Sequence, residues 1–143
     1  MGNFNYDNKA ESEPYSVQLK VGDVDYLSTY GMKLAAGRNL MPSDTVREVM
    51  INRHLAEKLG ILNPEDILGK NLRIGRNANL PIVGVVENFN SSTLREAYVP
   101  IAIYQKASWY YSAGMKLHPG SVENTVKEIE KLYSELFPET VFE

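Results

Sequence analysis

The segment "LPIVGVVENFNSSTLRE" (residues 80–96) begins apolar and ends polar. Its four central apolar or glycine residues, 83–86, predict a strand that is covered on both faces of a sheet. Pro81 has no backbone N–H, so it must lie at the entry of this strand or at an edge position. The polar residues that follow have two interpretations: a catalytic cluster, or a turn whose side chains satisfy backbone groups.

The catalytic interpretation requires conditions that the sequence does not supply. Glu87, next to Asn88, Asn90 and Ser91, would serve as a general base only with a raised pKa in a concave pocket. No G-x-S-x-G motif surrounds Ser91 or Ser92, so neither matches the nucleophile of an α/β-hydrolase. We therefore favour the turn, and we expect no catalytic residue and no enzymatic activity.

Other patterns argue against cofactors and nucleic acids. His54 and His118 belong to no H-x-x-x-H pair, and the chain has no cysteine, so we expect no metal site. No G-x-x-x-x-G-K-[ST] motif is present, which excludes the usual phosphate loop. A net charge of -3 gives no field that attracts nucleic acid. We therefore predict no bound cofactor and no nucleic-acid partner.

The ends of the chain differ in character. Residues 1–14 are polar and lack the basic and apolar regions of a signal peptide, so we expect a flexible lead. Apolar residues then recur at spacings of three and four from Val122 to Phe137, which predicts a long amphipathic helix capped by Ser121. We expect its apolar face to pack on a sheet, with Glu128 on the opposite, outward face.

Short elements with turn residues between them fill the middle of the chain. Alternating or apolar runs predict strands, Asp23 is the expected cap of the first helix, and Gly60 is expected to end the second. The expected strands are 15–21, 32–38, 49–52, 72–74, 80–86, 100–104, 109–117 and 140–142; the short helices are 24–30 and 53–59; and 41–48 is a loop.

Aromatic residues gather just before the long helix. Trp109, Tyr110 and Tyr111 are consecutive, and Tyr104 is nearby in the sequence. Such rings either form a platform for a ligand or partner, or pack in the core and along an edge strand, and we favour packing. Trp109, Tyr110, Tyr111 and Glu128 are nevertheless the candidate partner surface.

Five segments in this order resemble one family. They are "VDYLSTYGMKLAAGRNL" (24–40), "VMINRHLAEKLG" (49–60), "ILGKNLRIG" (67–75), "LPIVGVVENFNSSTLRE" (80–96) and "LYSELFPETVFE" (132–143). From about residue 15 onward the chain resembles the MacB-like periplasmic core domain of FtsX-type ABC transporter permeases.

The resemblance implies an α+β fold with two lobes. Residues 15–40 and 98–143 would form a lobe similar to the porter subdomain of efflux pumps, with βαβ units. Residues 41–97 would form an inserted, mostly β lobe that carries a short helix.

The resemblance also implies a function. The domain would be the extracytoplasmic, periplasmic part of a bacterial inner-membrane permease and would couple ATP-driven movement of membrane helices to export or release of a substrate, or to a partner protein. Its partners would be the membrane helices of the same permease and a cytoplasmic ABC ATPase across the bilayer, in a transporter that is a dimer. The alternative is an extracytoplasmic solute- or peptide-binding module without a mechanical role.

Overall fold

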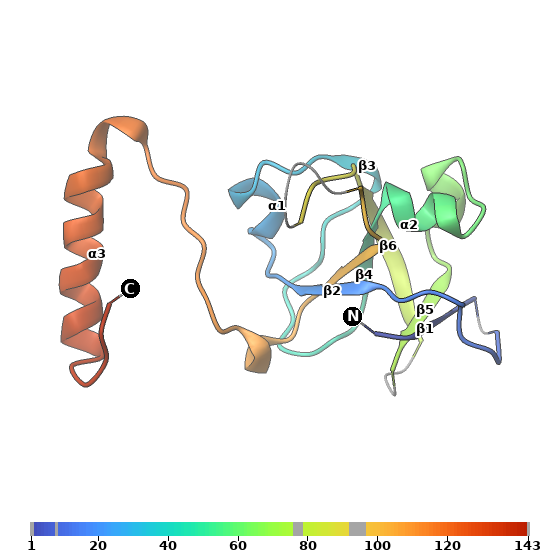
Figure 1. Ribbon diagram of the computed structural model, residues 1–143, viewed down its shortest axis with the longest axis horizontal. Helices are drawn as coiled ribbons and strands as arrows, with labels where there is room; N and C mark the ends of the chain where they lie inside the picture. Colours follow the sequence, from blue (N-terminus) through green and yellow to red (C-terminus); the bar gives the residue numbers. More distant parts are fainter. Residues whose placement is uncertain (1, 8, 76–78, 92–96, 143) are drawn as a thin grey trace. The chain divides into compact units, whose positions relative to one another are not determined.

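The computed structural model describes residues 2–7, 9–75, 79–91 and 97–142 and divides into two units, Met1–Ala113 and Gly114–Glu143 (Figure 1). The N-terminal unit contains the strands β1 (Phe4–Tyr6), β2 (Gln18–Val21), β3 (Leu34–Gly37), β4 (Val49–Asn52), β5 (Asn71–Ile74), β6 (Leu80–Val86) and β7 (Ile101–Tyr104). Its helices are α1 (Tyr26–Thr29) and α2 (Arg53–Lys58), and its 3-10 turns are η1 (Pro64–Ile67) and η2 (Ala107–Trp109). The C-terminal unit contains η3 (Pro119–Ser121) and α3 (Val122–Leu136).

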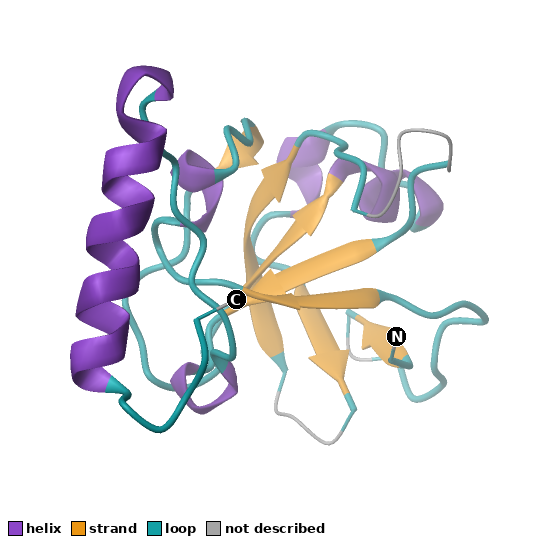
Figure 2. Ribbon diagram, turned by 60° about the vertical axis from the view of Figure 1, so that its left-hand side comes forward, coloured by secondary structure: helices purple, strands orange, loops and turns teal. Residues whose placement is uncertain are grey.

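The strands form one mixed sheet in the order β1-β5-β6-β4-β7-β2, and β3 also pairs with β6. Strand β6 runs parallel to β4, and β2 runs parallel to β7, whereas the other pairs are antiparallel. Strands β5 and β3 pair with successive parts of β6, at 80–81 and at 84–86. Figure 2 shows the strands twisting across this unit. The mixed sheet with a few helices confirms the predicted α+β class.

Strand β6 is largely buried, as expected for a strand that is covered on both faces. Leu80, Ile82, Val85 and Val86 are buried, and Pro81 is the second residue of the strand, near its entry. Gly84 is required because a Cβ atom there would collide with the backbone carbonyl oxygen of Arg38. Any side chain at this position would therefore push β3 and the chain that follows it away from the strand.

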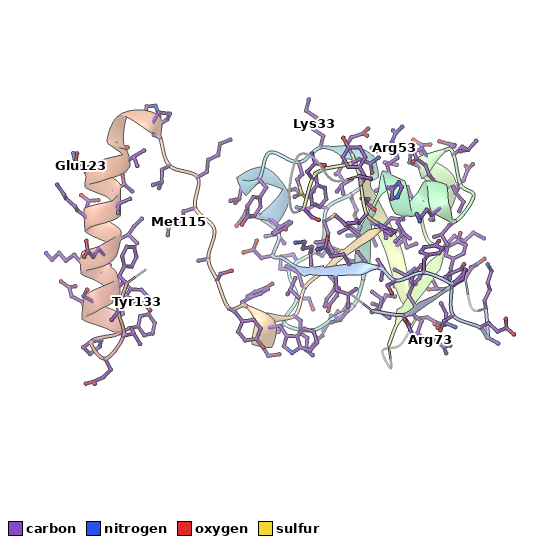
Figure 3. All side chains as sticks on the ribbon, viewed as in Figure 1. Lys33, Arg53, Arg73, Met115, Glu123 and Tyr133 are labelled. Carbon is purple, nitrogen blue, oxygen red and sulfur yellow. The ribbon has the colours of Figure 1, made fainter. Side chains whose placement is uncertain are left out.

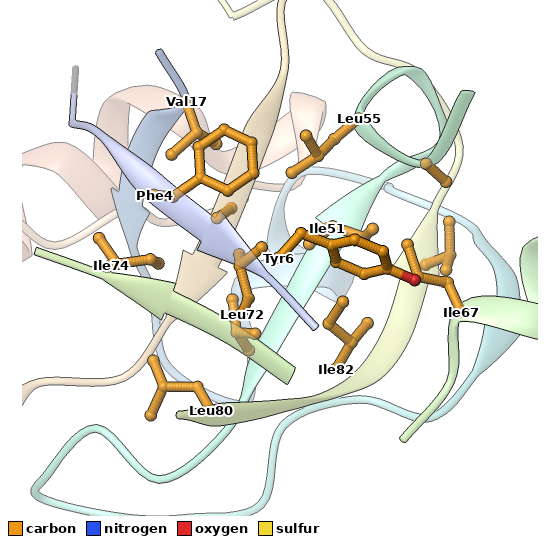
Figure 4. Close-up of a cluster of buried hydrophobic side chains, with 14 of the residues drawn as sticks. Phe4, Tyr6, Val17, Ile51, Leu55, Ile67, Leu72, Ile74, Leu80 and Ile82 are labelled. Atoms are coloured by element: carbon orange, nitrogen blue, oxygen red, sulfur yellow. The ribbon is translucent and has the colours of Figure 1, made fainter. Parts of the chain in front are cut away.

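Apolar side chains fill both faces of the sheet. The larger cluster includes Phe4, Ile51, Leu55, Leu72 and Ile82 and is drawn in Figure 4. A smaller cluster combines side chains of β4, β6 and β7 with one from α1 and one from the chain after β3: Met50, Val86, Ile101, Ile103, Leu27 and Leu40. Burial on both faces explains why β4, β6 and β7 read as nearly continuous apolar runs.

The flexible lead expected for residues 1–14 is wrong for the residues that the structure describes there. Strand β1 pairs antiparallel with β5, and Gly2 exchanges backbone hydrogen bonds of 2.9 and 3.0 Å with Val17. Phe4 is fully buried, with its ring 5.5 Å from that of Tyr15. Asn5 Nδ2 donates to two carbonyl groups of the following turn. Burial of Phe4 and the pairing of β1 with β5 therefore order this polar stretch.

Several other elements match their predictions. Strand β4 and helix α2 lie where expected, and Asn52 caps α2 by accepting a hydrogen bond from Leu55 N. The β5–β6 hairpin and β7 are confirmed as well. Gly60 follows α2 with a positive φ of 84°, as the helix stop requires.

Four other predictions are wrong. Helix α1 is shorter than 24–30, and Asp23 does not cap it, because its Oδ1 accepts from Asp25 N in a tight turn instead. Residues 109–117 form no strand, and neither do residues 140–142. At the C-terminus, Thr140 Oγ1 donates to Phe137 O and closes a turn.

The strand pairing crosses the boundaries predicted between the two lobes. Strands β4 and β6 fall in the range 41–97, yet β4 pairs with β7 and β6 pairs with β3. These partners belong to the ranges 98–143 and 15–40. The two predicted lobes are therefore joined through one continuous sheet.

The C-terminal unit is dominated by the predicted amphipathic helix. Tyr133 contacts Phe137 and Phe142, with ring centroids 5.2 and 5.5 Å apart. Ser121 stands at the N-cap position, but its hydroxyl donates to His118 O rather than capping the helix. Leu132 is 57% exposed, so the unit by itself does not bury the apolar face. Packing of that face on a sheet stays a prediction.

Candidate functional site

The polar cluster that follows β6 connects separate elements of the N-terminal unit. Glu87 Oε1 lies 3.1 Å from Arg53 Nη2 at the start of α2, and Asn88 Oδ1 accepts a 2.7 Å hydrogen bond from His54 N. Ser91 Oγ donates to Gln18 Oε1 of β2 at 2.6 Å. These contacts tie the exit of β6 to α2 and β2, which supports the turn interpretation. Ser92 lies outside the described residues.

Asn52 fixes the neighbouring strand end from inside the protein. Its side chain is fully buried and makes three hydrogen bonds. Oδ1 accepts from Leu55 N at 3.1 Å and from Ile101 N at 2.9 Å, and Nδ2 donates to Val99 O at 2.8 Å. One side chain therefore joins the end of β4, the start of α2 and the entry of β7.

A bidentate ion pair holds the loop 41–48 against the chain that leaves β3. The Arg38 guanidinium donates to both oxygens of Glu48 at 2.8 and 2.6 Å, and Met41 N donates to the same carboxylate at 2.7 Å. The Arg38 hydrogen bonds, assisted by the Met41 N–H, lower the pKa of Glu48 despite its partial burial. The loop is therefore anchored by a charged group that stays ionised.

The aromatic segment, defined as Trp109, Tyr110 and Tyr111, lies on the surface of the N-terminal unit. The three side chains are 44, 43 and 87% exposed, whereas Tyr104 is buried. The packing that we favoured for these rings is thus wrong for the aromatic segment and right for Tyr104. The strand expected over 109–117 would have buried alternate rings, and its absence leaves them exposed.

Contacts nevertheless give the aromatic segment a defined base. Lys106 Nζ lies 3.5 Å from the centroid of the Trp109 ring, a cation–π contact. Ala107 N donates to Asp44 O at 3.1 Å, which links η2 to the loop 41–48. Desolvation, followed by the charges of Asp23 and Asp44, raises the pKa of Tyr110. The segment can therefore present rings to a partner without first being ordered.

Glu128, the fourth residue of the candidate partner surface, is exposed on α3, a helix that has no buried residue. The same helix carries the ion pair between Lys127 Nζ and Glu123 Oε1, at 2.7 Å. Glu128 belongs to the C-terminal unit and the aromatic segment to the N-terminal unit, so each is a candidate surface of its own unit.

Two cavities were not predicted from the sequence. One, of about 360 Å³, lies between the turn before β3 and the chain after β6, and includes Tyr30 and Lys33. A second, of about 160 Å³, lies beside the loop 41–48. Figure 3 shows Lys33 and Arg53 at the same end of the N-terminal unit. No sequence pattern marks Tyr30 or Lys33, because the segments that form the first cavity are more than fifty residues apart.

The described part of the chain contains neither a cluster of metal ligands nor a membrane span. Within it, no three His, Asp or Glu side chains gather as metal ligands would. No helix among the described residues is both long enough and apolar enough to cross a membrane.

The sequence matches a known domain family over most of its length. The MacB-like periplasmic core domain matches residues 2–132, so the chain belongs to this family. The family is a domain of ABC transporter permeases, and membership implies an extracytoplasmic part of a membrane protein. Among curated proteins, no sequence matches significantly.

Solved structures share the fold at low sequence identity. The periplasmic region of MacB from Actinobacillus actinomycetemcomitans is 18% identical, with a TM-score of 0.61, over 94% of this chain and 62% of that one. A domain of a protein described as a permease, from Porphyromonas gingivalis, is 17% identical, with a TM-score of 0.60, over 99% of this chain and 72% of that one. The chain thus spans less than two thirds of the MacB region.

Proposed function

We propose that this chain is the periplasmic domain of an ABC transporter permease that transmits movement of the membrane helices to an exported substrate or to a partner protein. The observation that carries the proposal is the family match over residues 2–132. The shared fold with the periplasmic region of MacB supports it. The membrane helices would belong to the same permease, the ATPase would act across the bilayer, and the intact transporter would be a dimer.

The architecture of the N-terminal unit suits a body that moves without deforming. One sheet carries apolar clusters on both faces, so bending the sheet would open a close-packed interior. Buried Asn52 and the ion pair of Arg38 with Glu48 fix the ends of strands and the main loop. Rigid-body displacement is therefore the expected response to movement at the membrane.

The rim of such a body would carry the partner contacts. The aromatic segment is exposed on an ordered base, and interface cores are enriched in Trp and Tyr. In the intact permease, we expect Trp109→Ala with Tyr111→Ala to reduce transport, with little effect on folding. A matched variant is Leu62→Ala, which truncates a side chain that is 83% exposed elsewhere on the unit.

Cysteine labelling in cells tests the proposed location. The chain has no cysteine, so Leu62→Cys creates a single labelling site within it. In the intact permease with its native cysteines replaced, a membrane-impermeant maleimide should label this site in cells whose inner membrane is sealed. Labelling that appears only after the inner membrane is broken would place the domain on the cytoplasmic side and contradict the proposal.

The alternative function, a solute- or peptide-binding module without a mechanical role, makes a different prediction. Such a module would bind its ligand equally well whether or not the ATPase turns over. A mechanical domain would change its ligand or partner affinity with the nucleotide state. No catalytic step is part of either function.

A further inference from the structure

The larger cavity has the volume of a small-molecule site. Its volume of about 360 Å³ falls at the lower end of the range for small-molecule pockets, about 300 to 1,000 Å³. Two short segments line it: Tyr30, Gly31, Met32 and Lys33, then Glu87, Asn88, Phe89 and Asn90. None of these residues belongs to the aromatic segment or to α3.

The sheet positions both walls of the cavity. Strands β3 and β6 pair antiparallel up to Leu34 and Val86, and Glu87 N donates a final 2.8 Å hydrogen bond to Lys33 O. The next residues of each wall line the cavity instead of extending the ladder. Gly31, with φ of 65°, makes the turn that brings the first wall back from α1.

Part of the cavity lining is apolar and rests on the core. Met32 and Phe89 are half-buried and pack against the smaller core cluster. Tyr30 is 58% exposed, and its ring lies 4.8 Å from the ring of Tyr26, which limits its movement. A hydrophobic or aromatic body could therefore contact side chains that the core already holds in place.

The charges at the rim favour an anion. Lys33 makes no ion pair with any described residue, whereas Glu87 is paired with Arg53. The three groups together carry one net positive charge. Asn88 Oδ1 is occupied by His54 N, which leaves Asn88 Nδ2 as a donor without a partner among the described residues. This ammonium group and this amide donor, which have no partner among the described residues, match the acceptor oxygens of one carboxylate.

We propose that this cavity binds a small organic carboxylate with an apolar or aromatic body, of the kind that a free peptide C-terminus presents. Lys33 and Asn88 hold the carboxylate, while Tyr30, Met32 and Phe89 contact the body. All of the site's residues lie within the N-terminal unit, so its ligand binding can be tested separately from the mechanical function.

An NMR titration of the full chain tests this proposal, with N-acetyl-L-phenylalanine as the probe and its uncharged amide as the comparison. Saturable shifts are expected for the backbone amides of Gly31, Met32, Asn88 and Phe89. The acid should bind about tenfold more tightly than the amide, since a hydrogen bond to a charged group contributes about that factor. Sodium acetate, which lacks the body, should bind much more weakly than the probe.

Two variants with exposed or half-buried side chains assign the contacts. Lys33→Gln should weaken binding of the acid about five- to tenfold and leave the amide unaffected. Lys116→Gln, which makes the same charge change in the C-terminal unit, should bind like the parent. Asn88→Asp keeps the acceptor for His54 N but replaces the donor with a like charge, so it should weaken the acid at least as strongly. An unchanged spectrum outside the cavity shows that each variant is folded.

Three results would overturn the proposal. Equal affinity for the acid and the amide would show that the carboxylate is not the group that the cavity recognises. Undiminished binding of the acid by Lys33→Gln would show that the Lys33 ammonium group does not contact the ligand. Absence of saturable shifts at millimolar probe would mean that the cavity does not bind this class of ligand. None of these results bears on where the domain lies or how it moves.

Discussion

Replacing Asn52 with alanine should destabilise the protein more than any single surface change. The variant loses three hydrogen bonds from a fully buried side chain, those with Leu55 N, Ile101 N and Val99 O. Each buried backbone group left without a partner costs about 1 to 3 kcal/mol. Because relaxation and water entry recover part of this sum, we expect a loss of about 3 to 5 kcal/mol in the free energy of unfolding.

Urea denaturation followed by circular dichroism measures this loss. With a slope of about 2 kcal/mol/M, typical for a domain of this size, the midpoint should fall by roughly 1.5 to 2.5 M. Asn63→Ala serves as the control, since Asn63 is an exposed turn residue whose amide contacts Glu65 N and Asp66. The loss in the free energy of unfolding for Asn63→Ala should stay within about 1 kcal/mol.

A second variant separates the acceptor from the donor. Asn52→Asp keeps an oxygen that can accept from Leu55 N and Ile101 N. The carboxylate has no donor for Val99 O, however, and it places a charge in the interior. It should be destabilised as well. If Asn52→Ala lowers the midpoint by no more than Asn63→Ala does, the three bonds do not hold the strand ends together and the reasoning fails.

Three further predictions concern other parts of the fold. Phe4→Ala should cost about 3 to 5 kcal/mol, because Phe4 is fully buried, and a neutral result in urea would restore the flexible lead. Gly84→Ala should cost about 1 to 3 kcal/mol, since its Cβ would meet Arg38 O; Gly60→Ala, with open space around it, should cost only the strain of its positive φ. Glu48→Gln should cost up to about 1 kcal/mol at pH 7. The pKa of Glu48 is lowered from 4.5 in the folded state, so the stability difference between the parent and Glu48→Gln should be complete above pH 4.5 and vanish as the pH falls through the folded pKa. Urea titrations at several pH values measure this difference. A pH-independent difference would contradict the prediction.

The elements that the sequence predicts best are those whose local pattern and tertiary environment agree. Strands β4 and β6 are apolar on both faces because both faces are covered, and Gly60 ends α2 because the turn needs a positive φ. Strand β1 escapes prediction because three residues in a polar stretch carry no period, and the pairing with β5 and the burial of Phe4 that stabilise them are tertiary contacts. The strand predicted over 109–117 is wrong for the opposite reason. The aromatic composition of these residues favours a strand, but no described strand pairs with them.

The candidate sites follow the same division. The turn role of Glu87 and Asn88 could be inferred from their place after a buried strand. Their actual partners, Arg53 and His54, could not be inferred, because these contacts join residues 34 positions apart. Lys33 became a candidate only when the structure placed it beside Glu87. Sequence spacing gives neighbours along one element, whereas a cavity depends on how elements meet.

The most direct test of the central proposal measures distances in the intact permease with its ATPase. Spin labels at Leu62→Cys in the two copies of the domain report the distance between domains, and a second pair, Leu62→Cys with Ser28→Cys in one copy, reports the shape within a domain. Both positions are exposed and lie in the N-terminal unit. If the domain transmits movement as a rigid body, ATP should change the distance between copies and leave the distance within a copy unchanged. An ATP-independent distance between copies, in a transporter that hydrolyses ATP and exports its substrate, would contradict the account.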